Sequence, residues 1–351
     1  MSATFGSADR YYSTNRPDAP RDKQRRTLEE RFAALLEKYD RELPQRVDRA
    51  FKQWNGILRE YLRSETGLRL TVGEDTRAVP VRIRTGLPDP FAQILASVDE
   101  KEWLLLLNRS AIERAGHGLD FVQEEFDWLS SWEMVAPSPA KKDEVQNTAI
   151  LFGVLGEVIR KLAILDKIRA IDQDTLGAYF FRLWRPEVHL YWMVIGFTAA
   201  MLGIPVEALT VVVTIHELGH AYTHLGRDID GKRWETGAFA AADAGIVEGL
   251  AQFYTASICK KLYERFPPAW NAYTTLLENQ SGPYRAHEEW LKDTKTGGEV
   301  VRMSMITCRS TGTETLNDFE SLRKRYREEL QKDRRTNVVA DAKGSTGRQR
   351  P

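Results

Sequence analysis

The sequence predicts an α+β protein that is mostly helical, and two observations support this prediction. Apolar residues recur at helical intervals through long segments, such as residues 28–39, 47–62 and 150–165. Apolar and polar residues alternate in much shorter runs, at residues 68–72 and 79–83. We therefore expect helices to form most of the core and a few short strands to form a small sheet.

Length and charge limit the classes of protein that fit the sequence. The 351 residues suffice for one large domain or two ordinary domains. With 50 Lys and Arg against 50 Asp and Glu, the chain lacks the overall positive charge of a typical nucleic-acid binder, so we expect no nucleic-acid partner. Two cysteines are too few for a disulfide framework, and no secretory signal pattern is present. A cytoplasmic protein is expected, and its oligomeric state is open.

The longest apolar stretch, residues 191–215, has the length that crosses a bilayer. Gly203 and Pro205 divide this stretch, and the charged Glu207 lies inside it. These interruptions favour a buried core segment, so we do not expect a membrane association.

The N-terminal part of the chain is predicted to form a disordered leader and a helical region. Residues 1–25 are polar and have no apolar period, which indicates the leader. Residues 26–140 form the helical region with a β-hairpin. Thr27 and Glu30 have the spacing of a capping box, so we expect the first helix to begin there and to end at Pro44.

The two alternating runs at residues 68–72 and 79–83 flank a polar turn sequence, which predicts the β-hairpin. Pro80 cannot donate a backbone hydrogen bond, so we expect the second strand at a sheet edge. A Pro-Ser-Pro segment at residues 137–139 is the best candidate for a linker and places a domain boundary near residue 140.

Residues 141–315 form the second predicted domain. It begins with a strongly apolar helix over residues 143–171. Residues 188–195 are interpreted as a strand that leads into the next helix, with a helix as the competing interpretation. Residues 316–351 are predicted to form an amphipathic helix and a basic, partly disordered tail, because residues 322–351 hold ten Lys or Arg against four Asp or Glu.

The most informative segment is the run HELGH at residues 216–220. His216 and His220 lie four residues apart, so in a helix both imidazoles project from one face and can bind one metal ion. Neutral imidazole suits Zn²⁺. Glu217 is then available to take a proton from a water activated by the metal and to pass it to the leaving amine.

The residues around this motif predict a buried helix of about twenty residues. Pro205 suits its first turn, Glu207 complements the positive end of the helix dipole, and Gly226 follows as a stop. Several valines and leucines give it an apolar face. Burial of this helix would exclude bulk water from the site.

A catalytic zinc site needs three protein ligands and one open position. Glu248 is the preferred third ligand, because a carboxylate in the first turns of a buried helix is destabilising unless it is paired or bound to a metal. A salt bridge to an arginine is the alternative. Asp243 is the expected cap of that helix, or a residue that orients a zinc histidine. His224 lies roughly 12 Å along the helix from His216. We therefore expect it to be exposed, or to contact a metal ligand without binding the metal itself.

The run HELGH followed by Glu-Gly-Leu-Ala at residues 248–251 resembles the zincin metallopeptidases of the gluzincin type. The resemblance implies a zincin-like catalytic domain with a small sheet and an active-site helix. It also implies that His216, His220 and Glu248 bind one Zn²⁺ and that Glu217 is the catalytic base. The metzincins, which require a glycine three positions beyond the second histidine, and the peptide deformylases, whose third ligand lies in a cysteine motif, fit less well.

Catalysis also needs a donor for the developing oxyanion, and Tyr, His or Arg are the usual choices. Tyr284 and His287 follow a Gly-Pro pair, in a loop that we expect to fold over the cleft, and they are the predicted catalytic residues beside Glu217. Tyr254 and Arg285 are the alternatives.

The predicted function is zinc-dependent hydrolysis of peptide bonds in a peptide or protein substrate. The substrate is expected to pair in extended form with a strand at residues 188–195. A non-catalytic regulatory module with a structural zinc is the alternative, although such a site needs no base beside its ligands. An intramembrane protease is a third possibility, which the divided apolar stretch supports poorly.

Overall fold

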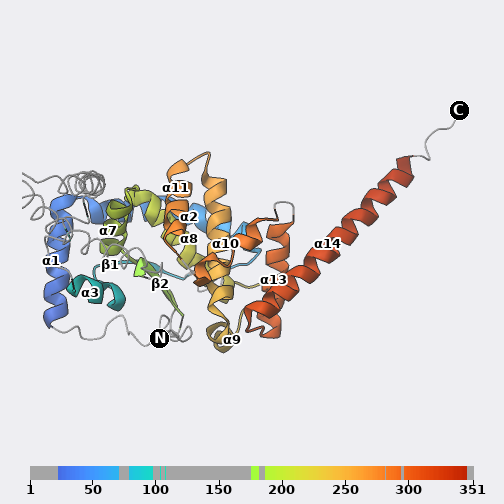
Figure 1. Ribbon diagram of the computed structural model, residues 1–351, viewed down its shortest axis with the longest axis horizontal. Helices are drawn as coiled ribbons and strands as arrows, with labels where there is room; N and C mark the ends of the chain where they lie inside the picture. Colours follow the sequence, from blue (N-terminus) through green and yellow to red (C-terminus); the bar gives the residue numbers. More distant parts are fainter. Residues whose placement is uncertain are drawn as a thin grey trace, which may run out of the picture.

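The computed structural model describes residues 23–70, 79–97, 103, 107, 175–181, 186–280, 282–293 and 296–345, with side chains to residue 332 (Figure 1). Most of the predicted leader, the linker and the long helix at residues 143–171 lie outside the described residues. Within the described part, helices dominate and three short strands form one mixed sheet, which confirms the predicted α+β class.

Two helices, α1 (Lys23–Tyr39) and α2 (Leu43–Thr66), form the N-terminal part of the described structure. The predicted start at Thr27 is wrong. α1 begins at Lys23, and the Thr27 hydroxyl donates a 3.0 Å hydrogen bond to the carbonyl of that residue inside the helix. The predicted end at Pro44 is also wrong, because α1 ends at Tyr39. Pro44 lies instead in the first turn of α2, where its missing N–H leaves no helical hydrogen bond unmade.

The sheet contains β1 (Val81–Arg84), β2 (Gly177–Phe180) and β3 (Glu187–Tyr191), in the order β1-β3-β2. β1 runs parallel to β3, and β2 runs antiparallel to it. β1 and β2 are therefore the edge strands of the described sheet, which confirms the edge position predicted from Pro80.

The predicted β-hairpin between the two alternating runs is wrong. Val81 lies opposite Val188 of β3, whereas Arg69 forms an isolated antiparallel bridge with Arg227 through backbone hydrogen bonds of 3.0 and 2.8 Å. Each run therefore pairs with a segment far along the chain. Alternation of apolar and polar residues predicts an extended backbone with one buried face, but it does not identify the partner strand.

The predicted strand at residues 188–195 divides into two elements. β3 ends at Tyr191, and α7 (Trp192–Leu202) begins at the next residue. β3 is also paired on both sides, so the expectation that it pairs with a substrate is wrong. A run of apolar residues that is buried on all sides shows neither the spacing of a helix nor the alternation of a strand. The sequence therefore cannot distinguish a strand from a helix there, or an edge strand from a central one.

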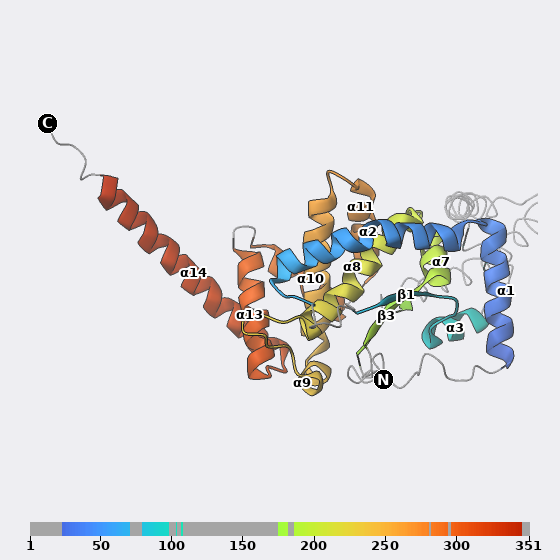
Figure 2. The same ribbon diagram turned by 180° about the vertical axis from the view of Figure 1, so that it is seen from behind.

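α8 (Val206–Leu225) carries the HELGH motif through the centre of the described fold (Figure 1 and Figure 2). Residues 208–224 are all buried, as predicted. α8 packs against α2, α10 (Ala244–Leu262), α11 (Pro267–Glu278) and β2. None of the described helices combines the length and the apolar character that crossing a membrane requires.

The remaining elements surround this centre. α3 (Asp89–Ala96) contacts α1, α9 (Thr236–Ala241) precedes α10, and the short turn η3 (Gly282–Arg285) leads into α12 (Glu288–Leu291). The last two helices are α13 (Gly297–Thr311) and α14 (Leu316–Ser345). α14 packs against α13 and then continues away from the rest of the described structure in both views (Figure 1 and Figure 2).

Candidate metal centre

The ends of α8 agree with the signals in its sequence. Pro205 lies at the start of the helix, and Glu207 in its first turn accepts hydrogen bonds of 2.7 and 2.9 Å from Arg46 of α2. Gly226 follows the last residue, and its N–H donates to the carbonyl of Tyr222. These contacts mark the two ends of α8, and its packing against α2, α10, α11 and β2 sets the positions of the side chains along it.

α10 brings the third predicted ligand to α8. Asp243 caps α10, because its carboxylate accepts a 2.7 Å hydrogen bond from the N–H of Gly245, and this confirms its predicted capping role. Gly219 lies between the two histidines of the motif, and a Cβ there would lie 3.3 Å from the Cα of Ala251. This close approach of the two backbones allows the short side chain of Glu248 to reach the histidines.

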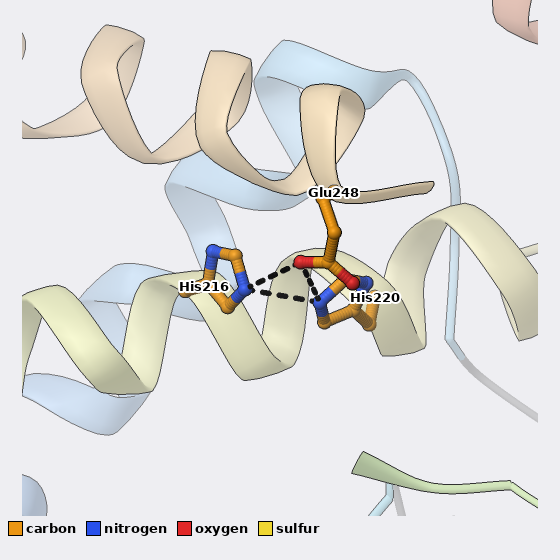
Figure 3. Close-up of side chains that lie close together, drawn as sticks. All are labelled: His216, His220 and Glu248. Carbon is orange, nitrogen blue, oxygen red and sulfur yellow. Dashed lines mark hydrogen bonds and ion pairs between the residues drawn. The ribbon is translucent and has the colours of Figure 1, made fainter. Parts of the chain in front are cut away.

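The three predicted ligands converge on one point (Figure 3). The Nε2 atoms of His216 and His220 lie 3.0 Å apart, and the Oε2 atom of Glu248 lies 3.2 Å from the first and 3.3 Å from the second. Ligand atoms that are about 2.0–2.2 Å from a tetrahedral zinc lie about 3.3–3.6 Å from one another. The observed distances of 3.0–3.3 Å lie at the lower end of this range or up to 0.3 Å below it, so small shifts of the side chains would let all three residues bind one metal ion of this size.

The protonation states of these residues also suit a divalent cation. Burial lowers the pKa of His216 to about 4, so its imidazole is neutral at pH 7. Burial alone would raise the pKa of the Glu248 carboxyl, but His220 and His216 hold it well below its usual range. The cluster thus places a carboxylate beside neutral imidazole in the core, and a bound cation would compensate this buried negative charge.

Glu217 lies on a different face of α8, against the edge strand β2. Its side chain is 1 % exposed. A Cβ at Gly177 of β2 would lie 2.8 Å from Cγ and 2.9 Å from Oε1 of Glu217, so the strand backbone touches this side chain directly. Sequence reasoning missed Gly177. A glycine at the start of a short strand gives no signal that identifies the side chain it will contact.

His224 is buried, so the expectation of an exposed side chain is wrong. Its Nδ1 lies 3.0 Å from the hydroxyl of Tyr179, its Nε2 lies 3.2 Å from the hydroxyl of Thr236, and its ring stacks on Phe239. Burial lowers the pKa of His224 to about 3, and the charges of nearby arginines add to this effect. His224 is not a member of the metal cluster, in agreement with the estimate from helix geometry.

Tyr284 lies beside the cluster, and its ring centroid is 6.1 Å from that of His216. His287 is fully buried, and both of its ring nitrogens have hydrogen-bond partners in the protein. Nε2 lies 2.5 Å from the hydroxyl of Tyr273, and Nδ1 lies 2.8 Å from the carbonyl of Tyr284. The structure therefore places Tyr284, and not the imidazole nitrogens of His287, next to the predicted ligands.

The two alternative donors make contacts elsewhere. The hydroxyl of Tyr254 lies 3.6 Å from the sulfur of Met305. Arg285 is half exposed and donates hydrogen bonds of 2.9 and 2.8 Å to the carboxylate of Glu288. These contacts favour Tyr284 over both residues.

Comparisons with known proteins found no relative of this chain. No family model, no curated protein and no solved structure matches the chain. Within the described residues, His216, His220 and Glu248 form the one group of three or more His, Cys, Asp or Glu side chains whose ligand atoms lie within 4.8 Å of one another.

Proposed function

We propose that the chain is a zinc-dependent metallopeptidase of the gluzincin type. The observation that carries this proposal is the convergence of His216 and His220 of α8 with Glu248 of α10 on one point. The three residues come from the two segments that resemble the gluzincin motif, and their ligand atoms lie within about 0.3 Å of the mutual distances expected around tetrahedral zinc.

The number of ligands favours a catalytic site over a structural one. A structural zinc is almost always enclosed by four protein ligands, whereas a catalytic zinc has three and keeps one position open. In the part of the chain that the structure describes, the cluster has three members. The acidic Glu217, one residue after the first histidine, also supports catalysis, because a structural site needs no base.

When bound, zinc supplies Lewis acidity and lowers the pKa of water toward ~7. The residues of the chain do the rest. Glu217 accepts a proton from the attacking water and transfers it to the amine that leaves. Its contact with the backbone of β2 at Gly177 restricts its motion, so that the carboxylate keeps one orientation. The ring of Tyr284 beside His216 makes its phenol the preferred donor toward the developing oxyanion.

In this proposal, the extended substrate pairs with the edge strand β2. β3 is paired on both sides, whereas β2 is an edge strand of the described sheet and its backbone touches Glu217. A peptide that adds to this edge in extended form receives backbone hydrogen bonds with little demand on its sequence. Its peptide bonds would then pass close to the proposed base.

Incubation of the purified chain with a mixture of unstructured peptides tests this function. We expect new fragments in the mass spectrum, whose formation stops after a chelator removes the metal and resumes after stoichiometric Zn²⁺ is added but not after Mg²⁺ is added. Zinc-loaded protein that leaves every peptide intact would contradict the proposed peptidase and favour the non-catalytic zinc module.

A further inference from the structure

We infer that His287 is a positioning residue, which links Tyr273 to Tyr284 and thereby holds the Tyr284 ring against the metal ligand His216. The inference deepens the proposed function and rests on the metal centre described above. In this role His287 acts through Tyr284 and does not contact the reacting atoms.

The directions of the two hydrogen bonds follow from the chemistry of the partners. The Tyr284 carbonyl only accepts, so Nδ1 of His287 carries the proton and donates across 2.8 Å. Burial lowers the pKa of His287 to about 4, so the ring is neutral at pH 7 and its Nε2 is an acceptor. Burial also raises the pKa of Tyr273, whose protonated hydroxyl therefore donates across 2.5 Å.

Tyr273 provides a fixed point for this link. It belongs to α11, is 2 % exposed, and its helix packs against both α8 and α10. These are the helices that supply the three ligands. The hydrogen bond from Tyr273 to His287 therefore connects Tyr284 to α11, which packs on the two helices that position the metal ligands.

The segment that carries Tyr284 has little regular structure of its own. η3 has four residues, and its first residue, Gly282, has a φ of 59°. The N–H of Ala286 reaches the Pro283 carbonyl at 3.3 Å, which is long for a hydrogen bond. The 2.8 Å bond from His287 is shorter than this backbone contact, so the imidazole is well placed to restrain the turn.

His287 also joins this turn to the helix that follows. Its carbonyl accepts hydrogen bonds of 2.9 and 3.1 Å from the N–H groups of Trp290 and Leu291. Its side chain thus faces α11 and η3, while its backbone begins α12. At the other end of the link, the Tyr284 ring lies 6.1 Å from the His216 ring at 32°, so a displacement of Tyr284 would change the surroundings of that imidazole.

Cobalt(II) binding to four variants of the full chain tests the inference, because cobalt takes N and O ligands like zinc and absorbs visible light. Substitution of residues that support metal ligands typically weakens the affinity for the metal by about 10–100-fold. We therefore expect about tenfold weaker cobalt binding and a shifted visible band for His287→Ala, and about threefold weaker binding for Tyr273→Phe. His287→Asn should bind about threefold more weakly than the wild type, like Tyr273→Phe, because its amide nitrogen replaces Nδ1 toward the Tyr284 carbonyl but nothing replaces Nε2 toward Tyr273. Tyr326→Phe, which removes a hydroxyl bonded to Thr307 between α13 and α14, is the matched control and should behave as wild type.

The outcomes separate this inference from the proposed function. Wild-type protein that binds cobalt, with Tyr273→Phe and His287→Ala unchanged in affinity and spectrum, would overturn the role of His287 and leave the metal centre intact. Wild-type protein that binds no cobalt would overturn both. If His287→Ala does not fold, Tyr273→Phe decides, because it removes one buried oxygen and leaves His287 in place.

Discussion

Replacement of Glu217 with glutamine lowers the rate constant of peptide hydrolysis by about 10²–10⁴-fold, the usual contribution of a general base. Glutamine has the shape of glutamate but accepts no proton at neutral pH. It therefore fits against the backbone of Gly177 and leaves His216, His220 and Glu248 as they are. Steady-state kinetics on a peptide that the wild type cleaves, together with metal analysis of the same samples, measures the effect.

Glu207→Gln is the matched control for this variant. Glu207 lies in the first turn of the same helix, is about one-third exposed and pairs with Arg46. Loss of that partly exposed ion pair should leave the rate constant unchanged. A Glu217→Gln variant with the wild-type rate would show that another residue is the base. A variant that has lost its zinc would show that Glu217 supports the cluster instead.

Substitution of Gly249 by alanine is expected to destabilise the fold by about 1–3 kcal/mol, the usual cost of an added methyl group in a packed core. A Cβ at this position would lie 2.6 Å from Cη2 of Trp290. Trp290 is fully buried and donates a 2.6 Å hydrogen bond to Glu320, so it has little freedom to move away. α10 must shift instead, and Glu248 shifts with it. Urea unfolding and zinc affinity should both show the loss.

Gly56→Ala is the control for this substitution. Gly56 lies on the exposed side of α2, and a Cβ there has nothing within 4 Å. Alanine in a helix interior is more stable than glycine by about 0.5–1 kcal/mol, so this variant should unfold at a higher urea concentration than the wild type. Equal midpoints for Gly249→Ala and the wild type would contradict the packing described here.

Local signals were sufficient to predict the helices that build the site. The spacing of His216 and His220 fixes their common face, Pro205 and Gly226 mark the ends of α8, and Asp243 marks the start of α10. Each of these signals acts within a few residues of the chain, so no tertiary information is needed. The choice of Glu248 used one further argument, the cost of a buried carboxylate, and the structure brings that residue to the histidines.

The features that the sequence did not predict depend on contacts between distant segments. Strand pairing is one, since Val81 pairs with Val188 and not with the preceding extended run. The environment of His224 is another, because its burial results from β2 and α9, which lie elsewhere in the sequence. The contact of Gly177 with Glu217 and the orientation of His287 toward Tyr273 belong to the same class.

Mass spectrometry of the tag-free protein measures its metal content and so tests the metal centre itself. We expect one zinc per chain in the wild type, none in His216→Ala and Glu248→Ala, and one in His224→Gln, whose side chain is one turn beyond the cluster. Loss of zinc in His216→Ala alone would remove Glu248 from the ligand set. A wild type without metal, even after incubation with Zn²⁺, would contradict the metal centre itself.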